Sequence, residues 1–327
     1  MNRLHEVMEN GAGLSPGLFT NDWLPFGQPV SQAALALPLP DSDSLYYLFH
    51  VRREYLSQMN MYGQSAACFP FYYSLIDVSE NDGLGSVLEK NIVLTEDTIG
   101  IGQITACRHA NGRDWWIIVF KYFSNQYHSL LLHPTGVMQY PLKIVGIPRP
   151  SGSGRAVFSP DGTKYVKFNL QMGPHLDVYD FDRCTGNLSN PRYLNYNHLT
   201  DLTGGVAISP NSRYLYVSSG RYIFQYDLHS ENIGSSETLI ADYVDTPGMK
   251  RFSGSQLAPD NKVYISGTSS SSYIHVIHNP NAAGAACEFE QGGLFLGAES
   301  RNWAGIPNHP YYGLGPWDGS PCDTLGI

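Results

Sequence analysis

The 327-residue chain is rich in turn-forming and aromatic residues and poor in charge. Charged residues make up 15% of it, the net charge is −9, and neither a basic run nor a long apolar stretch occurs. This composition argues against a nucleic-acid groove, an anionic membrane surface and a transmembrane helix. The 33 glycines, 21 prolines and 22 tyrosines favour an all-β protein with frequent strand reversals.

A hairpin pattern recurs along the chain. Residues 1–30 hold one short apolar stretch and several turns, and the first hairpin, "QAALALPLPDSDSLYYLFHV", begins at Gln32. Residues 52–70 are then expected to form an insertion. Later hairpins are "QITACRHANGRDWWIIVF", "AVFSPDGTKYVKF", "AISPNSRYLYVSS" and "QLAPDNKVYISGT". The prolines at positions 160, 210 and 259 are 50 and 49 residues apart, so the hairpin returns at a nearly fixed step.

Two further strands are expected after each hairpin. The third strands are predicted over Phe71–Val78, Tyr127–Leu132, His175–Phe181, Tyr222–Leu228 and Tyr273–His278. The fourth are predicted over Val87–Leu94, Gln139–Val145, Pro191–Tyr196, Glu237–Tyr243 and Phe289–Phe295. Alternation and short apolar runs dominate, and no amphipathic helix is expected.

Four antiparallel strands repeated about every 50 residues predict the blades of a β-propeller. Five blades are readable over residues 31–296, with partial terminal blades beside them and six to seven blades in the complete domain. The innermost strands carry small residues, as in Gly204-Gly205 and Gly254-Ser255, which suits a crowded axis. A pair of β-sandwiches is the competing architecture, but it gives no reason for a fixed repeat.

The domain boundaries follow from this repeat. One propeller domain is predicted over residues 1–319, in which 1–30 are the remnant of an earlier blade and 297–319 a closing segment. Residues 320–327 are expected to begin a linker. The start of the chain has no signal-peptide pattern, which taken literally indicates a cytoplasmic chain.

No catalytic constellation can be assembled from the sequence. Asp161, Asp260 and Asn211 occupy equivalent turn positions on separate blades, where such residues usually fix the turn. The histidines lack metal-ligand or protease spacing, and Asp41 with Asp43 is weak evidence for calcium. We therefore expect no catalytic residue, no metal and no cofactor.

Polar residues near the starts of the innermost strands are the candidate binding site. Loops that enter these strands open on the face where propellers usually bind ligands. The candidates are Gln32, Gln103, Arg155, Lys250, Arg251, Gln256 and Arg301. Gln32, Gln103 and Gln256 are expected to occupy similar places. The alternative is that these side chains only satisfy buried backbone at the axis.

Several stretches resemble one family. "MNRLHEVMENGAGL", "YYSLIDVSENDGLGSVLEKN", "LYVSSGRYIFQYDL" and "GIPNHPYYGLG" are similar to the propeller module of large bacterial surface proteins associated with gliding motility and type IX secretion. "DVSENDGLG" and "GIPN" are the more specific parts, and the likeness spans nearly the whole chain. It implies a secreted or cell-surface propeller, and it implies that this chain is a fragment or starts inside the domain.

The expected function is non-enzymatic binding of a protein or glycan at the cell surface through one face of a monomeric propeller. The alternative is an extracellular hydrolase or lyase that acts on carbohydrate or a lactone at the central channel. Two or more acidic or histidine side chains within hydrogen-bond reach at the channel mouth would favour the enzyme. Cytoplasmic scaffolding of the WD-repeat type is a third interpretation.

Overall fold

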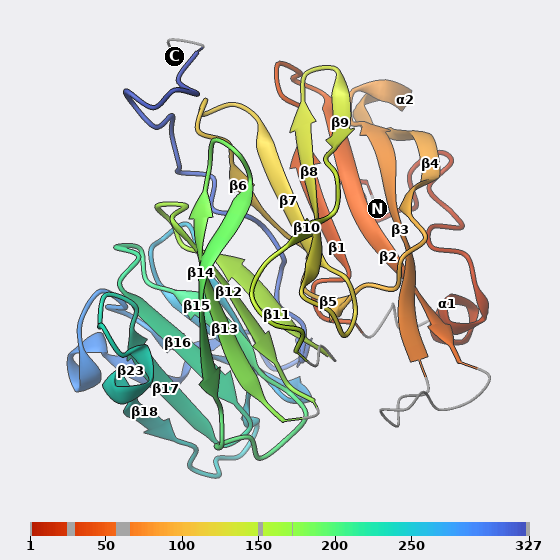
Figure 1. Cartoon of the computed structure of the whole chain (residues 1–327). Coiled ribbons are helices and arrows are strands. Elements are labelled where there is room, and N and C mark those ends of the chain that lie inside the picture. Colours follow the sequence, from red (N-terminus) through yellow and green to blue (C-terminus); the bar gives the residue numbers. More distant parts are fainter. Residues whose placement is uncertain (1, 25–29, 57–65, 150–152, 172, 325–327) are drawn as a thin grey trace. The chain divides into compact units, whose positions relative to one another are not determined.

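The computed structural model describes residues 2–24, 30–56, 66–149, 153–171 and 173–324 (Figure 1). The chain divides into two compact units. The first comprises Met1–Ser151 with Gly315–Ile327, and the second comprises Gly152–Leu314. None of the helices in these described ranges is long and apolar enough to cross a membrane.

The first unit holds two antiparallel sheets. The first sheet has the order β1 (Ala34–Pro38), β2 (Leu45–Tyr55), β3 (Ala66–Asp77) and β4 (Ser86–Thr95). The second sheet begins with β6 (Thr105–Arg108), β7 (Trp115–Phe120) and β8 (Gln126–His133). Two short strands, β9 (Gly136–Gln139) and β10 (Lys143–Ile144), then both pair with β8. The short strand β5 (Ile101–Gly102) precedes β6.

The second unit holds three four-stranded sheets in the same meander order. The third sheet is β11 (Ser153–Phe158), β12 (Lys164–Asn169), β13 (His175–Asp182) and β14 (Asn187–Asn195). The fourth is β15 (Gly205–Ile208), β16 (Tyr214–Ser219), β17 (Tyr222–Asp227) and β18 (Thr238–Asp242). The fifth is β19 (Phe252–Leu257), β20 (Val263–Gly267), β22 (Tyr273–Ile277) and β23 (Phe289–Phe295).

The remaining elements are short. β21 (Ser270–Ser271) pairs with β24 (Asn302–Trp303). The helical elements are α1 (Leu18–Trp23), α2 (Glu80–Gly83), and the 3-10 turns Ile233–Ser236 and Gly284–Cys287. Asn81 and Asp82 within α2 have positive φ angles, so this element is a tight turn. The expectation of an essentially all-β protein is confirmed.

These sheets are the blades of a β-propeller, and the five predicted repeats are confirmed. Each sheet starts with its innermost strand and proceeds outward by hairpins, which is the blade plan. One detail was wrong. Residues 52–55 and 66–70, which were expected to belong to an insertion, are strand residues, because β2 extends to Tyr55 and β3 begins at Ala66; residues 57–65 lie outside the described residues. Pairing between the two long strands carries them past the expected ends.

Adjacent sheets pack face to face through their apolar side chains. In the first unit, Phe49 and Phe71 of the first sheet share a buried cluster with Ile117 of the second. In the fourth sheet, neighbouring residues point to opposite faces. Val217 therefore packs with the core of the third sheet and Tyr216 with that of the fifth. A blade is thus stabilised on both faces by its neighbours.

Residues at both ends of the predicted repeat pack against the sheets. Glu9 forms a single parallel bridge with Ser86 of the outer strand of the first sheet, and α1 contacts β2 of the same sheet. Near the other end, the backbone N–H of Trp317 donates to the carbonyl oxygen of Ala110 at 2.8 Å. The assignments of 1–30 as a blade remnant, of 297–319 as a closing segment and of 320–327 as a linker stay predictions.

Candidate functional site

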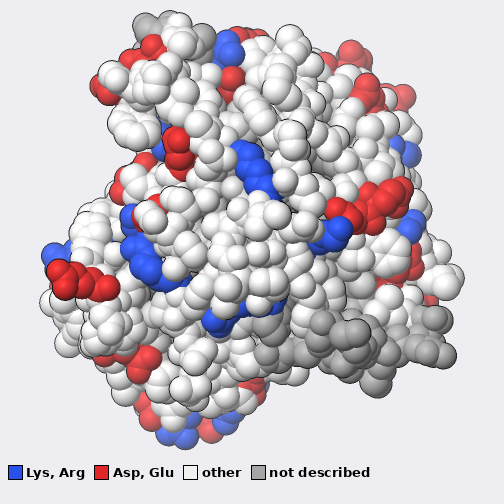
Figure 2. Space-filling model, viewed as in Figure 1, with Lys and Arg blue, Asp and Glu red and all other residues white. Residues whose placement is uncertain are grey.

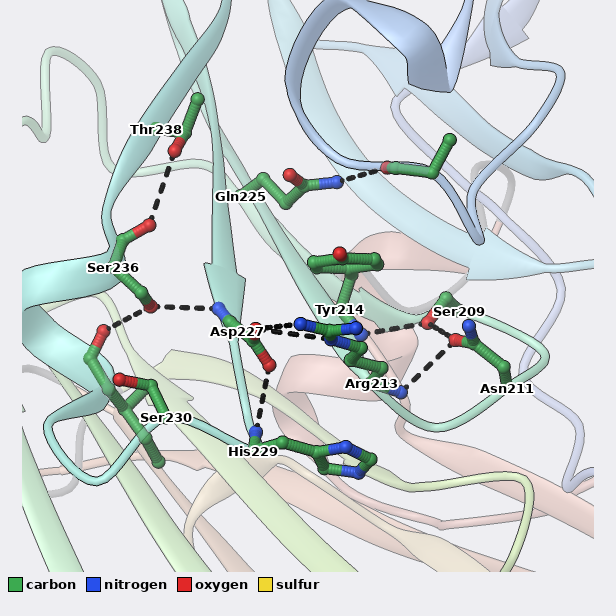
Figure 3. Close-up of polar contacts among 12 residues, drawn as sticks. Ser209, Asn211, Arg213, Tyr214, Gln225, Asp227, His229, Ser230, Ser236 and Thr238 are labelled. Carbon is green, nitrogen blue, oxygen red and sulfur yellow. Dashed lines mark hydrogen bonds and ion pairs between the residues drawn. The ribbon is translucent and has the colours of Figure 1, made fainter.

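The repeated Asp and Asn residues of the inner hairpins bond to their own turns. The side-chain oxygen of Asn211 accepts hydrogen bonds from Ser209 Oγ at 2.7 Å and from the Arg213 N–H at 3.2 Å (Figure 3). Asp161 accepts from the N–H of Thr163 at 2.9 Å in the same way. Arg213 reaches outward to Asp227 at 2.8 Å. These side chains fix turns, which agrees with the interpretation from sequence.

Two of the predicted binding residues occupy equivalent places. Gln32 and Gln103 each lie two residues before an innermost strand, and both have a positive φ, of 50° and 73°. Both are buried. The side-chain amide of Gln103 has no hydrogen-bond partner among the described residues. The predicted similarity therefore holds for this pair, whereas a binding role for either residue stays a prediction.

Gln256 does not share this place. It is the fifth residue of β19, pairs with Tyr264, and its Nε2 donates to the carbonyl oxygens of Leu257 and His309 at 3.3 Å. It lies close to the Pro259 turn, at the opposite end of the strand. The expected equivalence with Gln32 and Gln103 was wrong because it rested on a shared residue type rather than on the distance to the turn.

Arg155 lies where the innermost strands of the second unit meet. It is the third residue of β11, and burial lowers the pKa of its guanidinium to about 10. A Cβ on Gly254 of β19 would lie 2.3 Å from its Nη2, so this glycine makes room for the side chain. Ser255, also on β19, shares a 2.5 Å hydrogen bond between its hydroxyl group and that of Ser218 on β16.

The other three predicted residues are exposed and have separate partners. Arg251 Nη1 lies 3.7 Å from Asp201, and the carbonyl oxygen of Lys250 accepts a hydrogen bond from His275 at 2.8 Å. Arg301 donates to the carbonyl oxygens of Ala298 and Ser300. These contacts do not gather the three side chains into one cluster. Figure 2 shows a face on which positive and negative groups are interspersed and most atoms carry neither.

A cluster that the sequence reasoning missed lies on the loop that enters the second sheet. Asp97 follows β4, and its two carboxylate oxygens contact Lys121 Nζ at 2.8 Å and His128 Nε2 at 3.1 Å. Lys121 follows β7 and His128 is on β8. We call Asp97, Lys121 and His128 the entry-loop cluster. Its members are partly accessible, with side-chain exposures of 30%, 36% and 15% respectively.

The backbone holds this loop in place. The N–H of Tyr122 donates to the carbonyl oxygen of Thr98 at 2.9 Å, and the N–H of Gly100 donates to that of Phe120 at 3.1 Å. Ile99 forms bridges with Lys121 and Cys68. The loop therefore runs as an added strand beside the end of β7, which fixes the Asp97 carboxylate against the second sheet.

Charge and burial set the protonation of the cluster. The hydrogen bond from Lys121 is the main cause that holds the pKa of Asp97 below its usual value, and His128 adds to it. Burial lowers the pKa of His128 and outweighs the raising effect of Asp97. At neutral pH the cluster therefore presents an ionised carboxylate and a neutral imidazole.

Other pairs of ionisable groups serve the framework. His198 stacks on Phe224 with ring centroids 4.1 Å apart, and its partner Glu237 also accepts a hydrogen bond from Tyr226. Lys167 and His175 approach Asp177 within 3.3 Å and 3.6 Å, but all three are buried. In the ranges the structure describes, no three His, Cys, Asp or Glu residues are placed to hold a metal ion.

The sequence matches no known protein family and no curated protein. Solved structures resemble the fold at low identity. A protein of unknown function from Desulfotomaculum acetoxidans is 16% identical, with 85% of this chain and 75% of that chain covered and a TM-score of 0.48. A candidate 6-phosphogluconolactonase from Bacteroides fragilis is 11% identical, with 86% of this chain and 87% of that chain covered and a TM-score of 0.47. Another from Bacteroides uniformis is 12% identical, with 85% of this chain and 86% of that chain covered and a TM-score of 0.43. Likeness of this degree carries no information about activity.

Proposed function

We propose that this protein hydrolyses a small ester or lactone and that the reaction takes place at the entry-loop cluster. The 3.1 Å contact between His128 and Asp97 is the observation that carries the proposal. A hydrogen-bonded imidazole and carboxylate form the general-base arrangement of many hydrolases. The sequence favoured a binding protein because no acid–base pair was found, and this pair changes that preference.

The groups have complementary roles. With His128 Nε2–H donating to Asp97, Nδ1 carries the lone pair that takes a proton from water. The water oxygen forms a bond to the carbonyl carbon, and the C–O bond to the leaving oxygen breaks. The imidazolium then returns its proton to that oxygen, so one lactone and one water give one hydroxy acid. Asp97 stabilises the imidazolium that forms in between.

Lys121 supplies the positive charge of the site. Its ammonium group contacts Asp97 at 2.8 Å and is more than a third exposed. Negative charge develops on the substrate oxygen during the attack, and a nearby cation stabilises it. The same charge favours substrates that carry a carboxylate or a phosphate. These roles support a small polar ester or lactone as the substrate class.

Replacement of His128 tests the proposal. The purified protein is assayed with a pH indicator on δ-gluconolactone, dihydrocoumarin and p-nitrophenyl acetate. His128→Asn is expected to lower kcat/KM by about 100-fold or more, because general-base catalysis contributes on that scale. The rate of the wild-type protein should fall only at a pH below the ordinary histidine pKa, since burial lowers the pKa of His128.

His133→Asn is the matched control, because His133 is on the same strand and outside the cluster. It should retain the wild-type rate. Lack of hydrolysis of all three substrates by the wild-type protein, or an unchanged rate in His128→Asn, would contradict the proposal. The interpretation as a non-enzymatic binder, the surface location and the monomeric state remain predictions from sequence.

A further inference from the structure

The strongly exposed aromatic side chains of the second unit are concentrated in the last part of its sequence. Among its described residues they are Phe295, Trp303, Tyr311 and Tyr312, with exposures of 54%, 76%, 37% and 49%. Trp303 is the most exposed of these side chains. Exposed aromatic groups gathered in one short stretch usually mark a binding surface.

The segment Asn302–Tyr312, which we call the aromatic segment, is fastened to the fifth sheet. Trp303 pairs with Ser270 in the ladder between β21 and β24. Ser266 Oγ donates to the carbonyl oxygen of Ala304 at 3.2 Å, and Gln256 Nε2 donates to that of His309. The rings are therefore held on an anchored backbone, which reduces the entropy lost when a ligand binds.

The chemistry of the segment is neutral. From position 302 to position 317 the sequence contains no Asp, Glu, Lys or Arg. It offers aromatic faces together with backbone carbonyls, whereas Asn302 is turned inward: its Nδ2 donates to the carbonyl oxygen of Gly305 at 2.7 Å and its Oδ1 is buried. A nucleic acid or an acidic peptide would require cations here, and a basic partner would require carboxylates.

We infer that the aromatic segment binds a neutral polysaccharide. The C–H groups on one face of a pyranose ring pack on an indole or phenol ring, and sugar hydroxyls donate to exposed carbonyl groups. Trp303 is the central contact because it is the most exposed ring and lies on a paired strand. Tyr311 adds a ring face and a hydroxyl. This inference does not depend on the proposed hydrolase.

Affinity electrophoresis of the full chain tests the inference. Native gels contain hydroxyethylcellulose, barley β-glucan, konjac glucomannan or neutral arabinoxylan, and a gel without polysaccharide is the reference. The wild-type protein is expected to be retarded by at least one of them. Trp303→Ala should weaken that interaction by about tenfold or more, the scale for loss of a central aromatic contact. Tyr311→Ala should weaken it less.

Trp317→Ala is the control, because Trp317 is also exposed and ends the same uncharged stretch but belongs to the first unit. It should be retarded like the wild-type protein. All replaced side chains are exposed, and unchanged urea midpoints would show that the variants fold. If no polysaccharide retards the wild-type protein, or if Trp303→Ala is retarded equally, the inference is wrong.

Discussion

At the scale of single residues, one turn position has the same conformation in four of the sheets. Gly112, Gly162, Ser212 and Asn261 all have φ between 61° and 75°. The N–H of each donates to the carbonyl oxygen three residues earlier. Glycine and asparagine adopt this left-handed conformation easily, whereas serine does so at a cost. Ser212 offsets that cost because its Oγ accepts the N–H of Asp161 in the neighbouring sheet at 2.9 Å.

Replacement of Ser212 measures this contact. Ser212→Ala loses the hydrogen bond and keeps the strained φ, so the free energy of unfolding should fall by about 1–2 kcal/mol. Ser212→Gly loses the same hydrogen bond but relaxes the backbone, so it should be destabilised less. Urea unfolding curves of both variants compare them, and equal stability of the two variants would contradict the assigned role of the backbone.

At the scale of elements, the innermost strands of the second unit approach unusually closely. A Cβ on Gly205 of β15 would lie 2.2 Å from the backbone nitrogen of Ser255 on β19. Gly205 is buried, and its φ lies outside the left-handed region. Position 205 therefore requires glycine because a side chain would not fit between the two backbones, and not because of its backbone conformation.

A side chain at position 205 should separate these strands. Gly205→Val is expected to lower the free energy of unfolding by about 3 kcal/mol or more, because neither backbone can move without disturbing its sheet. Gly234→Ala is the control, since its added Cβ meets only ordinary contacts at 3.5 Å and beyond. Thermal unfolding distinguishes them, and equal melting temperatures would refute the close approach.

Strand positions were predictable where local chemistry decides them. Phe289–Phe295 was predicted with the observed bounds, and Tyr222–Leu228 ends one residue beyond β17. Alternation of apolar residues and turn formers set these limits. Gln139–Val145 was predicted as one strand but contains the end of β9 and all of β10. That difference depends on pairing with β8, which sequence does not reveal.

The candidate site was less predictable than the strands. The position of Gln103 before β6 was predictable because it stands at a fixed distance from a recognisable hairpin, whereas its binding role stays a prediction. Asp97 and His128 are 31 residues apart, and neither belongs to a motif. Their contact depends on how the entry loop lies against β7 and β8. The one available signal was that the loop "TEDTIG" is polar and leads into an innermost strand.

At the scale of the whole molecule, each unit contains a buried neutral histidine. His50 lies between Ser15 and Ser74 in the first unit, and His275 accepts the N–H of Gly292 in the second. Burial lowers the pKa of each to about 4. A proton on His275 Nδ1 would break the hydrogen bond from Gly292. Both units therefore have a defined reason to lose stability in acid.

Acid should destabilise the protein over a defined pH range. The unfolded histidines take up protons below about pH 6.5 and the folded ones only near pH 4. Stability should thus fall from pH 6.5 to pH 4, by up to about 3 kcal/mol for each histidine. Urea midpoints measured across this range test it. His275→Gln should flatten the slope and His5→Gln, which is exposed, should not, whereas a flat wild-type profile would contradict the expectation.

The contacts between turns and the following sheet have a consequence for synthesis of the chain. The N–H of Asp161 is satisfied by Ser212, 51 residues later, and that of Asn211 by Asn281, 70 residues later. A growing chain that leaves the ribosome therefore presents these two hairpins before the residue that accepts the hydrogen bond from each turn has been made. A chain truncated before residue 212 should accordingly leave the Asp161 turn more accessible to proteases than it is in the full chain.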